Sequence, residues 1–139
     1  MGLETERDSR DYLYGRLLAV AEHIESRALY IAGESRDTNA AKLMQRFSER
    51  PYSTWLQIEQ ALVPYKSRLQ AQPRQTGFLF TMKNLLGEIH SLFNREDYMN
   101  DIKLEGEFLL GYHCQRRDLQ LKTKEEDVSD SIDTKEEGN

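Results

Sequence analysis

Three basic residues in the first half of the chain share one spacing. Lys42, Arg46 and Arg50 follow one another at intervals of four, which places them on one face of a helix, where like charges repel. A surface that only has to be soluble usually mixes charges of both signs. This row of cations, which we call the basic ridge, therefore indicates an anionic partner, although a solvated helix face explains the charge alone equally well.

Three further arginines are candidates for the same kind of surface. No acid lies three or four positions from Arg16 or Arg27, so neither arginine has an acidic partner within its own helix. Arginines of this kind can instead pair with acids of neighbouring helices. Arg116 is followed two positions later by Asp118, which does not face it. The candidate nucleic-acid contacts are Arg16, Arg27, Lys42, Arg46, Arg50 and Arg116.

Residues that could bind a metal or catalyse a reaction do not share a helical spacing. A zinc site on a helix commonly uses two histidines three or four positions apart. His113 and Cys114 are adjacent, so on a helix they point about 100° apart. Glu105 and Glu107 are two positions apart and face away from each other. We therefore expect no metal, no cofactor and no enzymatic activity.

The length and composition favour one folded domain followed by a tail. A chain of 139 residues can bury about two-thirds of the surface that its unfolded form exposes. Residues 122–139 contain seven acids, three lysines and no aromatic residue, which is too little apolar area to offset the entropy of ordering them. We expect a flexible lead at residues 1–9, a helical bundle at residues 10–121 and a disordered acidic tail at residues 122–139.

The same composition bears on where the protein works. No apolar run approaches the ~20 residues of a membrane span, and the polar sequence MGLETERDSR at the N-terminus does not resemble a signal peptide. The single cysteine, Cys114, excludes an internal disulfide and agrees with a reducing compartment. We expect a soluble, cytoplasmic protein.

The apolar pattern predicts an all-α fold, a single-domain bundle of about five helices. Eighteen leucines stand against three valines, and apolar residues recur every three or four positions. The first helix is expected to begin at Asp8 or Ser9 and to end at Gly33. Its buried stripe is Leu13, Leu17, Val20, Ile24, Ala28 and Ile31.

Prolines and further stripes divide the rest of the chain. A second helix is expected from Asp37 or Thr38 to about Glu49. The stripe from Trp55 to Leu69 contains Pro64, so this helix should kink or restart there. A strongly patterned helix follows between residues 78 and 93, and a last one from about residue 103 to 121. In the last helix the inward residues are Leu104, Phe108, Tyr112, Gln115 and Leu119, with Gly106 and Gly111 permitting close backbone approach.

Two segments resemble a known family. Residues 11–26 read DYLYGRLLAVAEHIES and residues 106–119 read GEFLLGYHCQRRDL. Both resemble the C-terminal helical region of the large subunit of type I-C CRISPR effector complexes, which has a Tyr-Leu-x-Gly-Arg-Leu motif and a later Phe-x-Leu-Gly-Tyr-Tyr-His-Gln-Arg motif. The matching residues are Tyr12, Leu13, Gly15, Arg16, Leu17, Phe108, Leu110, Gly111, Tyr112, Gln115 and Arg116. The chain departs from the second motif at His113 and Cys114.

The resemblance implies a role as well as a fold. It implies a separate small subunit, made from an internal start within the large-subunit gene, that lines the belly of an RNA-guided complex and helps to hold the DNA strands of the R-loop. Its implied partners are the large subunit, the backbone subunits, other copies of itself and the DNA strands, with guide RNA as a further candidate. A cationic surface would suit sequence-independent contacts to phosphate. The alternative is a helical scaffold that binds only proteins.

Overall fold

Every element of the described chain is a helix, which confirms the all-α prediction. The computed structural model describes residues 2–137, and side chains as far as residue 123. The α-helices are α1 (Arg10–Ala32), α2 (Asn39–Lys42), α3 (Met44–Glu49), α4 (Pro51–Gln70), α5 (Thr76–Leu92), α6 (Arg95–Tyr98) and α7 (Glu107–Glu137), with a short 3-10 helix, η1 (Pro73–Gln75), before α5.

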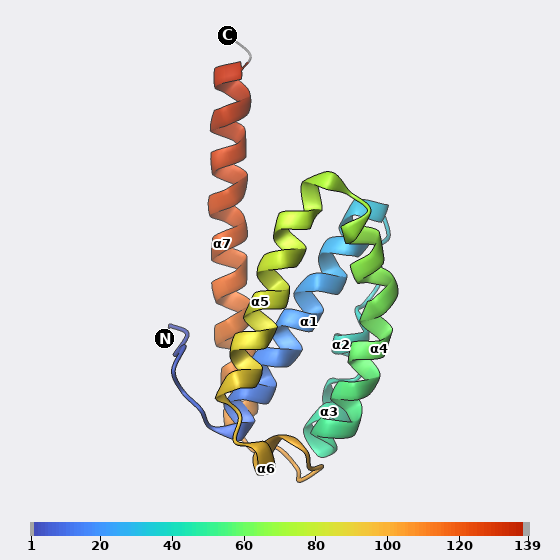
Figure 1. Cartoon of the computed structure of the whole chain (residues 1–139), viewed down its shortest axis with the longest axis vertical. Helices are drawn as coiled ribbons and strands as arrows, with labels where there is room; N and C mark the ends of the chain where they lie inside the picture. The colour runs from blue at the N-terminus through green and yellow to red at the C-terminus, as the bar shows by residue number, and fades with distance from the viewer. Residues whose placement is uncertain (1, 138–139) are drawn as a thin grey trace.

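Helix α1 is the centre of the bundle. Its ends are those predicted: Ser9 caps the first turn by accepting a hydrogen bond from the Tyr12 amide, and Gly33 ends the helix with φ of 71°, which glycine adopts without strain. Residues 12–21 are all buried, because α7, α4 and α5 pack around this half of α1 (Figure 1). The predicted stripe is therefore only part of the buried surface, and its last member, Ile31, is 39% exposed because it lies in the last turn, beyond the enclosed half of α1.

The predicted second helix is two short helices. Thr38 caps α2 by accepting a hydrogen bond from the Ala41 amide at 3.0 Å. Leu43 has φ of −98° and ψ of 6° and separates α2 from α3. Pro51 occupies the start of α4, where its missing amide proton breaks no hydrogen bond.

The predicted restart at Pro64 does not occur, and the kink stays a prediction. Helix α4 runs from Pro51 to Gln70 as one element, and its apolar stripe is buried as expected. Both Pro64 and Gln60, whose carbonyl loses its helical partner, are exposed. Water can therefore satisfy that carbonyl, and the helix continues.

Helices α1 and α7 cross at close range. A Cβ atom placed on Gly15 would stand 2.1 Å from the Phe108 carbonyl oxygen, and one on Gly111 would stand 2.1 Å from the Tyr12 carbonyl oxygen. Gly111 therefore has the predicted role, and Gly15 shares it. Gly106 has no neighbour within 4 Å of such an atom, so that part of the prediction is wrong.

The last helix begins and ends later than the sequence indicated. Leu104 lies before α7, where its amide donates to the Ser48 carbonyl at 2.7 Å, and the five inward residues predicted here are all buried. Helix α7 continues to Glu137 and extends past the other helices (Figure 1). Because side chains after residue 123 and the backbone of residues 138–139 lie outside the description, the predicted disordered tail at residues 122–139 stays a prediction.

Candidate nucleic-acid interface

The basic ridge lies on three successive pieces of backbone. Lys42 ends α2, Arg46 belongs to α3, and Arg50 is the junction to α4 with φ of −138° and ψ of 73°. All three residues are exposed. Among the side chains that the structure describes, none comes within ion-pair distance of these cations. The ridge is thus free to meet an anion, although not on the single helix that the spacing predicted.

Arg50 has an acid in its neighbourhood without pairing to it. The Asp101 carboxylate accepts hydrogen bonds from the Ser53 amide at 2.9 Å and from the Ser53 hydroxyl. These bonds lower the pKa of Asp101, with a smaller contribution from the Arg50 cation. Asp101 therefore offsets part of the charge at this end of the ridge, and Lys42 and Arg46 form its more strongly cationic part.

A groove borders the ridge between α2, α3 and the start of α7. It has a volume of about 650 Å³ and is lined by Ala41, Lys42, Met44, Gln45, Ser48, Leu104, Glu105, Gly106, Phe108 and Leu109. Lys42 stands on one wall and Glu105 among the residues that lead into α7. The groove is mixed in charge, and Lys42 is the ridge residue that lines it.

Glu25 positions the ridge, and sequence reasoning missed it. Its carboxylate is 2% exposed and accepts hydrogen bonds from the Asn39 amide, at 2.9 and 3.0 Å, and from the Arg36 guanidinium at 3.2 Å. These bonds tie the first residue of α2, and the loop before it, to α1. The sequence gives one indication of this role: Glu25 directly follows Ile24 of the apolar stripe, and an acid in that position needs a buried hydrogen-bonding partner.

Arg16 is part of the core rather than the surface. It is 2% exposed, its Nε donates to Gln115 Oε1 at 2.8 Å, and its Nη1 donates to the Thr5 carbonyl at 3.5 Å. Burial lowers the pKa of Arg16, because a low dielectric disfavours its charge. Its place in the nucleic-acid set does not fit this structure, in which it joins α1, α7 and the N-terminal segment.

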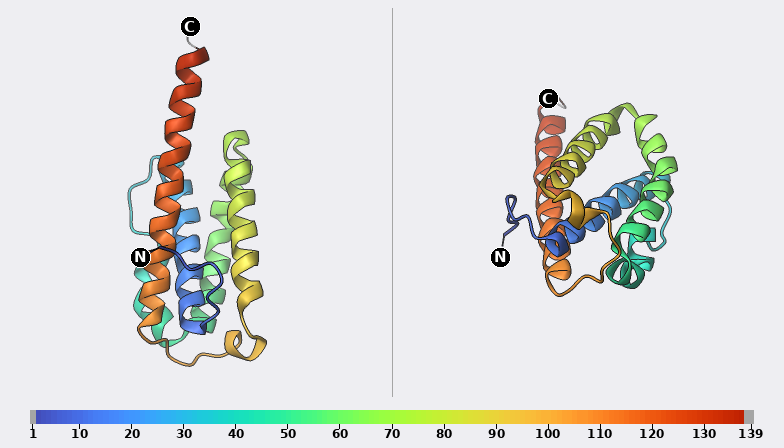
Figure 2. Two further views of the ribbon diagram at one scale, coloured as in Figure 1. Left: turned by 90° about the vertical axis from the view of Figure 1, so that its left-hand side faces the viewer. Right: turned by 60° about the horizontal axis from the view of Figure 1, so that its bottom comes forward.

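Arg27 lies on a different side of the molecule from the ridge. Its guanidinium stacks on the Phe78 ring with 4.2 Å to the centroid, and it donates to Gln75 Oε1 at 3.2 Å. Helix α5, which carries Phe78, and the pair α2 and α3 lie on opposite sides of α1 (Figure 1; Figure 2, left). Arg27 and the ridge therefore do not form one continuous row.

Arg116 pairs with an acid of α1. Its Nε lies 3.4 Å from Glu22 Oε1, and its side chain is 49% exposed. The Tyr112 hydroxyl donates to the other oxygen of Glu22 at 2.7 Å. Arg116 thus has a structural partner, and the structure brings together only Lys42, Arg46 and Arg50 of the six candidates.

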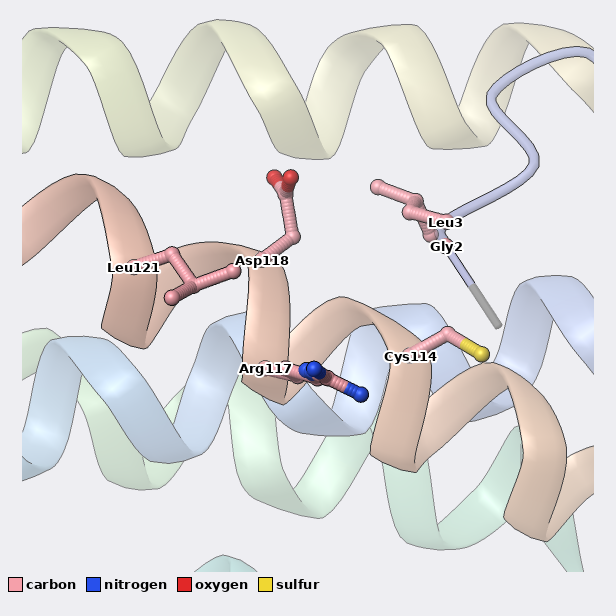
Figure 3. Close-up of a pocket in the computed structure, with 6 residues that line it drawn as sticks. All are labelled: Gly2, Leu3, Cys114, Arg117, Asp118 and Leu121. Carbon is pink, nitrogen blue, oxygen red and sulfur yellow. The ribbon is translucent and has the colours of Figure 1, made fainter.

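The residues around Cys114 do not converge on a reactive group. Cys114 is 8% exposed and lies beside Gly2 and Leu3 at a hollow of about 220 Å³ that Arg117, Asp118 and Leu121 also line (Figure 3). Asp118 points toward α5 and Arg117 points elsewhere (Figure 3). In the described part of the chain, no three histidine, cysteine, aspartate or glutamate residues cluster as metal ligands would.

None of the described helices combines the length and the apolar character that crossing a bilayer requires.

A protein-family model matches most of the chain. The family model described as CRISPR-associated protein (Cas_Csd1) matches residues 1–120. No curated protein matches the chain. The family model thus covers α1, the part of α7 that crosses it and the whole basic ridge.

Proposed function

The chain belongs to the Cas_Csd1 family of CRISPR-associated proteins and so has a role in CRISPR defence; from this premise we propose that it is a non-catalytic small subunit of an RNA-guided interference complex. It lines the belly of the complex and stabilises the R-loop by sequence-independent contacts to the nucleic-acid backbone. Its partners are the large subunit, the backbone subunits, other copies of itself and the separated DNA strands. It works in the cytoplasm.

The observation that carries the proposal is the exposed basic ridge. The Glu25 contacts tie the start of α2, the helix that ends at Lys42, to α1, and none of the three ridge cations forms an ion pair with a side chain that the structure describes. Exposed cations that have no acid paired to them in the fold attract a polyanion. Separated DNA strands supply such a polyanion, and phosphate contacts made by lysine and arginine are independent of sequence.

One observation favours the second candidate, a scaffold that binds only proteins. Arg16, Arg27 and Arg116 all have partners within the fold, so the cationic surface is smaller than the sequence suggested. An acidic protein surface of similar size would fit the ridge equally well. The two functions differ in whether the isolated protein binds DNA at low salt.

The test is single-stranded DNA binding over a series of salt concentrations. The variant reverses the ridge (Lys42→Glu, Arg46→Glu and Arg50→Glu). The matched control reverses three exposed arginines elsewhere, Arg74, Arg95 and Arg117, and changes the net charge by the same amount. If the ridge contacts three phosphates, its reversal reduces the slope of log affinity against log salt by about 2.

The control keeps this test from reporting net charge alone. The proposal requires the ridge variant to bind much more weakly than the control variant. Equal affinities and equal salt slopes would remove the ridge as the site. If the unmodified protein does not bind even at low salt, the scaffold function is the better one.

A further inference from the structure

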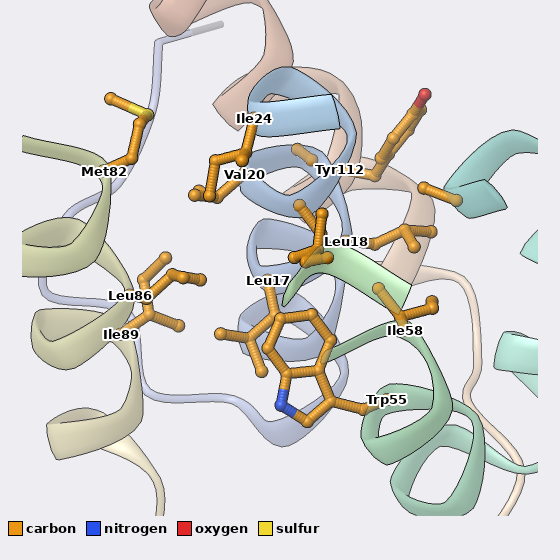
Figure 4. Packing of buried hydrophobic residues seen from close by; sticks show 14 of the residues in the cluster. Leu17, Leu18, Val20, Ile24, Trp55, Ile58, Met82, Leu86, Ile89 and Tyr112 are labelled. Carbon is orange, nitrogen blue, oxygen red and sulfur yellow. The ribbon is translucent and has the colours of Figure 1, made fainter. Parts of the chain in front are cut away.

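A second groove lies between α4 and α5, the two helices that flank α1 in Figure 4. It has a volume of about 290 Å³ and is lined by Trp55, Glu59, Leu62, Lys66, Lys83, Leu86, Gly87 and His90. The floor is apolar, since Trp55, Leu62 and Leu86 are all nearly buried there. None of the candidate nucleic-acid contacts lines it. It is therefore a surface distinct from the basic ridge.

Gly87 is the most informative residue of this groove. It lies well inside α5, and nothing stands within 4 Å of a Cβ atom placed on it. A glycine inside a helix is less favourable than alanine by about 1 kcal/mol. At Gly15 and Gly111 that loss is explained by the crossing of α1 and α7, but the contacts of the fold do not explain it at Gly87. The open space at Gly87 is what a second backbone needs for a close approach.

Exposed apolar residues follow both rims. Leu56, Val63 and Phe80 are 42%, 58% and 66% exposed. Leu56 and Val63 lie three before and four after Glu59, and Phe80 lies three before Lys83, so helical geometry places each beside a groove residue. The apolar surface thus continues out of the groove along α4 and α5, as expected for a helix-binding groove.

The charges of the groove indicate the chemistry of its occupant. Lys66 and Lys83 line it together, and neither forms an ion pair with a side chain in the described part of the chain. The other titratable groups are Glu59 and His90, which line it with Trp55. Carboxylates of a bound segment would meet the two lysines favourably.

Trp55 adds a hydrogen-bond donor. Its indole N–H is buried and has no acceptor in hydrogen-bond geometry among the described residues. The Tyr98 hydroxyl lies nearby: burial raises the pKa of Tyr98, and the indole N–H opposes that rise slightly. The indole nitrogen lies on the side that faces α5 (Figure 4). An oxygen brought into the groove could accept a hydrogen bond from this N–H group.

We propose that the groove between α4 and α5 binds an acidic amphipathic α-helix of a partner protein. The apolar stripe of that helix packs between Leu56, Val63 and Phe80, its backbone comes closest at Gly87, and its carboxylates meet Lys66 and Lys83. The inference deepens the assembly part of the proposed function, on which it rests, by naming a surface and the chemistry of the partner. It does not depend on the basic ridge binding DNA.

The test uses two synthetic helical peptides of about five turns with the same leucine and alanine stripe. One peptide has glutamates along its flanks and the other has lysines. Trp55 is the one tryptophan of the chain, so its indole N–H gives a single NMR signal at the groove. The glutamate peptide should shift this signal and bind at least about tenfold more tightly than the lysine peptide.

Two glycines of the same helix supply a matched pair of variants. Gly87→Leu fills the groove, whereas Gly77→Leu places the same side chain on α5 outside it, and neither position has a neighbour within 4 Å. Both variants should fold, which far-UV circular dichroism checks. Gly87→Leu should weaken binding of the glutamate peptide at least about tenfold, and Gly77→Leu should leave it unchanged.

Charge reversal completes the test. Lys66→Glu together with Lys83→Glu should invert the preference so that the lysine peptide binds more tightly. Equal effects of the two glycine variants, or no shift of the indole signal with either peptide, would overturn the proposal. A dimer in sedimentation that Gly87→Leu dissolves would place a second copy in the groove and overturn the assignment to a separate partner.

DNA binding separates this proposal from the proposed function. Gly87→Leu should leave single-stranded DNA affinity unchanged, and reversal of the ridge should leave peptide binding unchanged. Loss of DNA binding in Gly87→Leu would instead identify the groove as a nucleic-acid site and overturn the peptide assignment.

Discussion

Substituting alanine for Gly111 tests the helix crossing on which the fold depends. The new Cβ atom would stand 2.1, 2.9 and 3.0 Å from the carbonyl oxygen, carbonyl carbon and Cα atom of Tyr12. These are backbone atoms and cannot rotate away as a side chain can. Because ordinary contacts begin at 3.4 Å, α1 and α7 must separate locally by about 1 Å.

The expected loss of stability follows from two opposing effects. Overpacking of this kind costs about 1–3 kcal/mol, and a contact with backbone belongs at the upper end. Replacing a helical glycine by alanine returns about 1 kcal/mol. The net loss is about 2 kcal/mol, which lowers the melting temperature by about 7 °C if unfolding entropy is about 2.1 cal/mol/K per residue.

Thermal unfolding followed by far-UV circular dichroism measures this loss, with Gly87→Ala as the control. The same substitution at Gly87 meets open space, so only the gain in helix propensity remains, and the melting temperature should rise by about 3 °C. The two variants should therefore change stability in opposite directions. A Gly111→Ala protein that melts at or above the temperature of the unmodified protein would show that the helices do not cross at this distance.

Three further outcomes follow from individual residues. Arg16→Ala leaves Gln115 Oε1 without its donor and should lower the free energy of unfolding, measured by urea titration, by about 2–3 kcal/mol. The DNA affinity of the folded protein should stay unchanged. A lower DNA affinity at unchanged stability would contradict the place of Arg16 in the core. Thr38→Ala removes the acceptor of the Ala41 amide and should cost about 1 kcal/mol, and a stability loss near zero would contradict the cap. Burial, helped by the Arg27 cation, lowers the pKa of His23 from 6.5 to about 4. Because the unfolded chain then binds more protons than the folded protein, the free energy of unfolding should fall as pH drops from about 7 to 4. His23→Gln should make this fall with pH less steep, and an unchanged pH dependence would refute the prediction.

Local features of the fold could be predicted because their causes are local. Ser9, Thr38 and Gly33 act on amides and carbonyls a few residues away, and the sequence shows them directly. The restart at Pro64 does not occur, because Gln60 faces water, which is decided by the packing of α4 against α1. The same limit applies to Ile31, which belongs to the stripe by spacing but lies where α1 is no longer enclosed.

The candidate site was harder to predict because charge partners are distant in sequence. Arg16 and Gln115 are 99 positions apart, and Glu22 meets Arg116 across the same pair of helices. A single sequence shows that these arginines lack partners within their own helices, but not which neighbouring helix supplies them. Exposure of the three ridge cations could be predicted from their spacing and charge, because it does not depend on a partner from another helix. These cations are Lys42, Arg46 and Arg50.

The two family-like motifs have a structural explanation that separates fold from function. At the crossing of α1 and α7, Gly15 of the first motif lies against the backbone of Phe108 and Tyr112 in the second motif, and Gly111 of the second lies against the backbone of Tyr12 in the first. Arg16 of the first motif donates to Gln115 of the second. These residues preserve the packing of two helices, and none of them lies on the basic ridge. Changes at the crossing should therefore act on stability, and changes at the ridge on binding. A ridge variant that loses DNA affinity while its melting temperature is unchanged would be direct support for that separation.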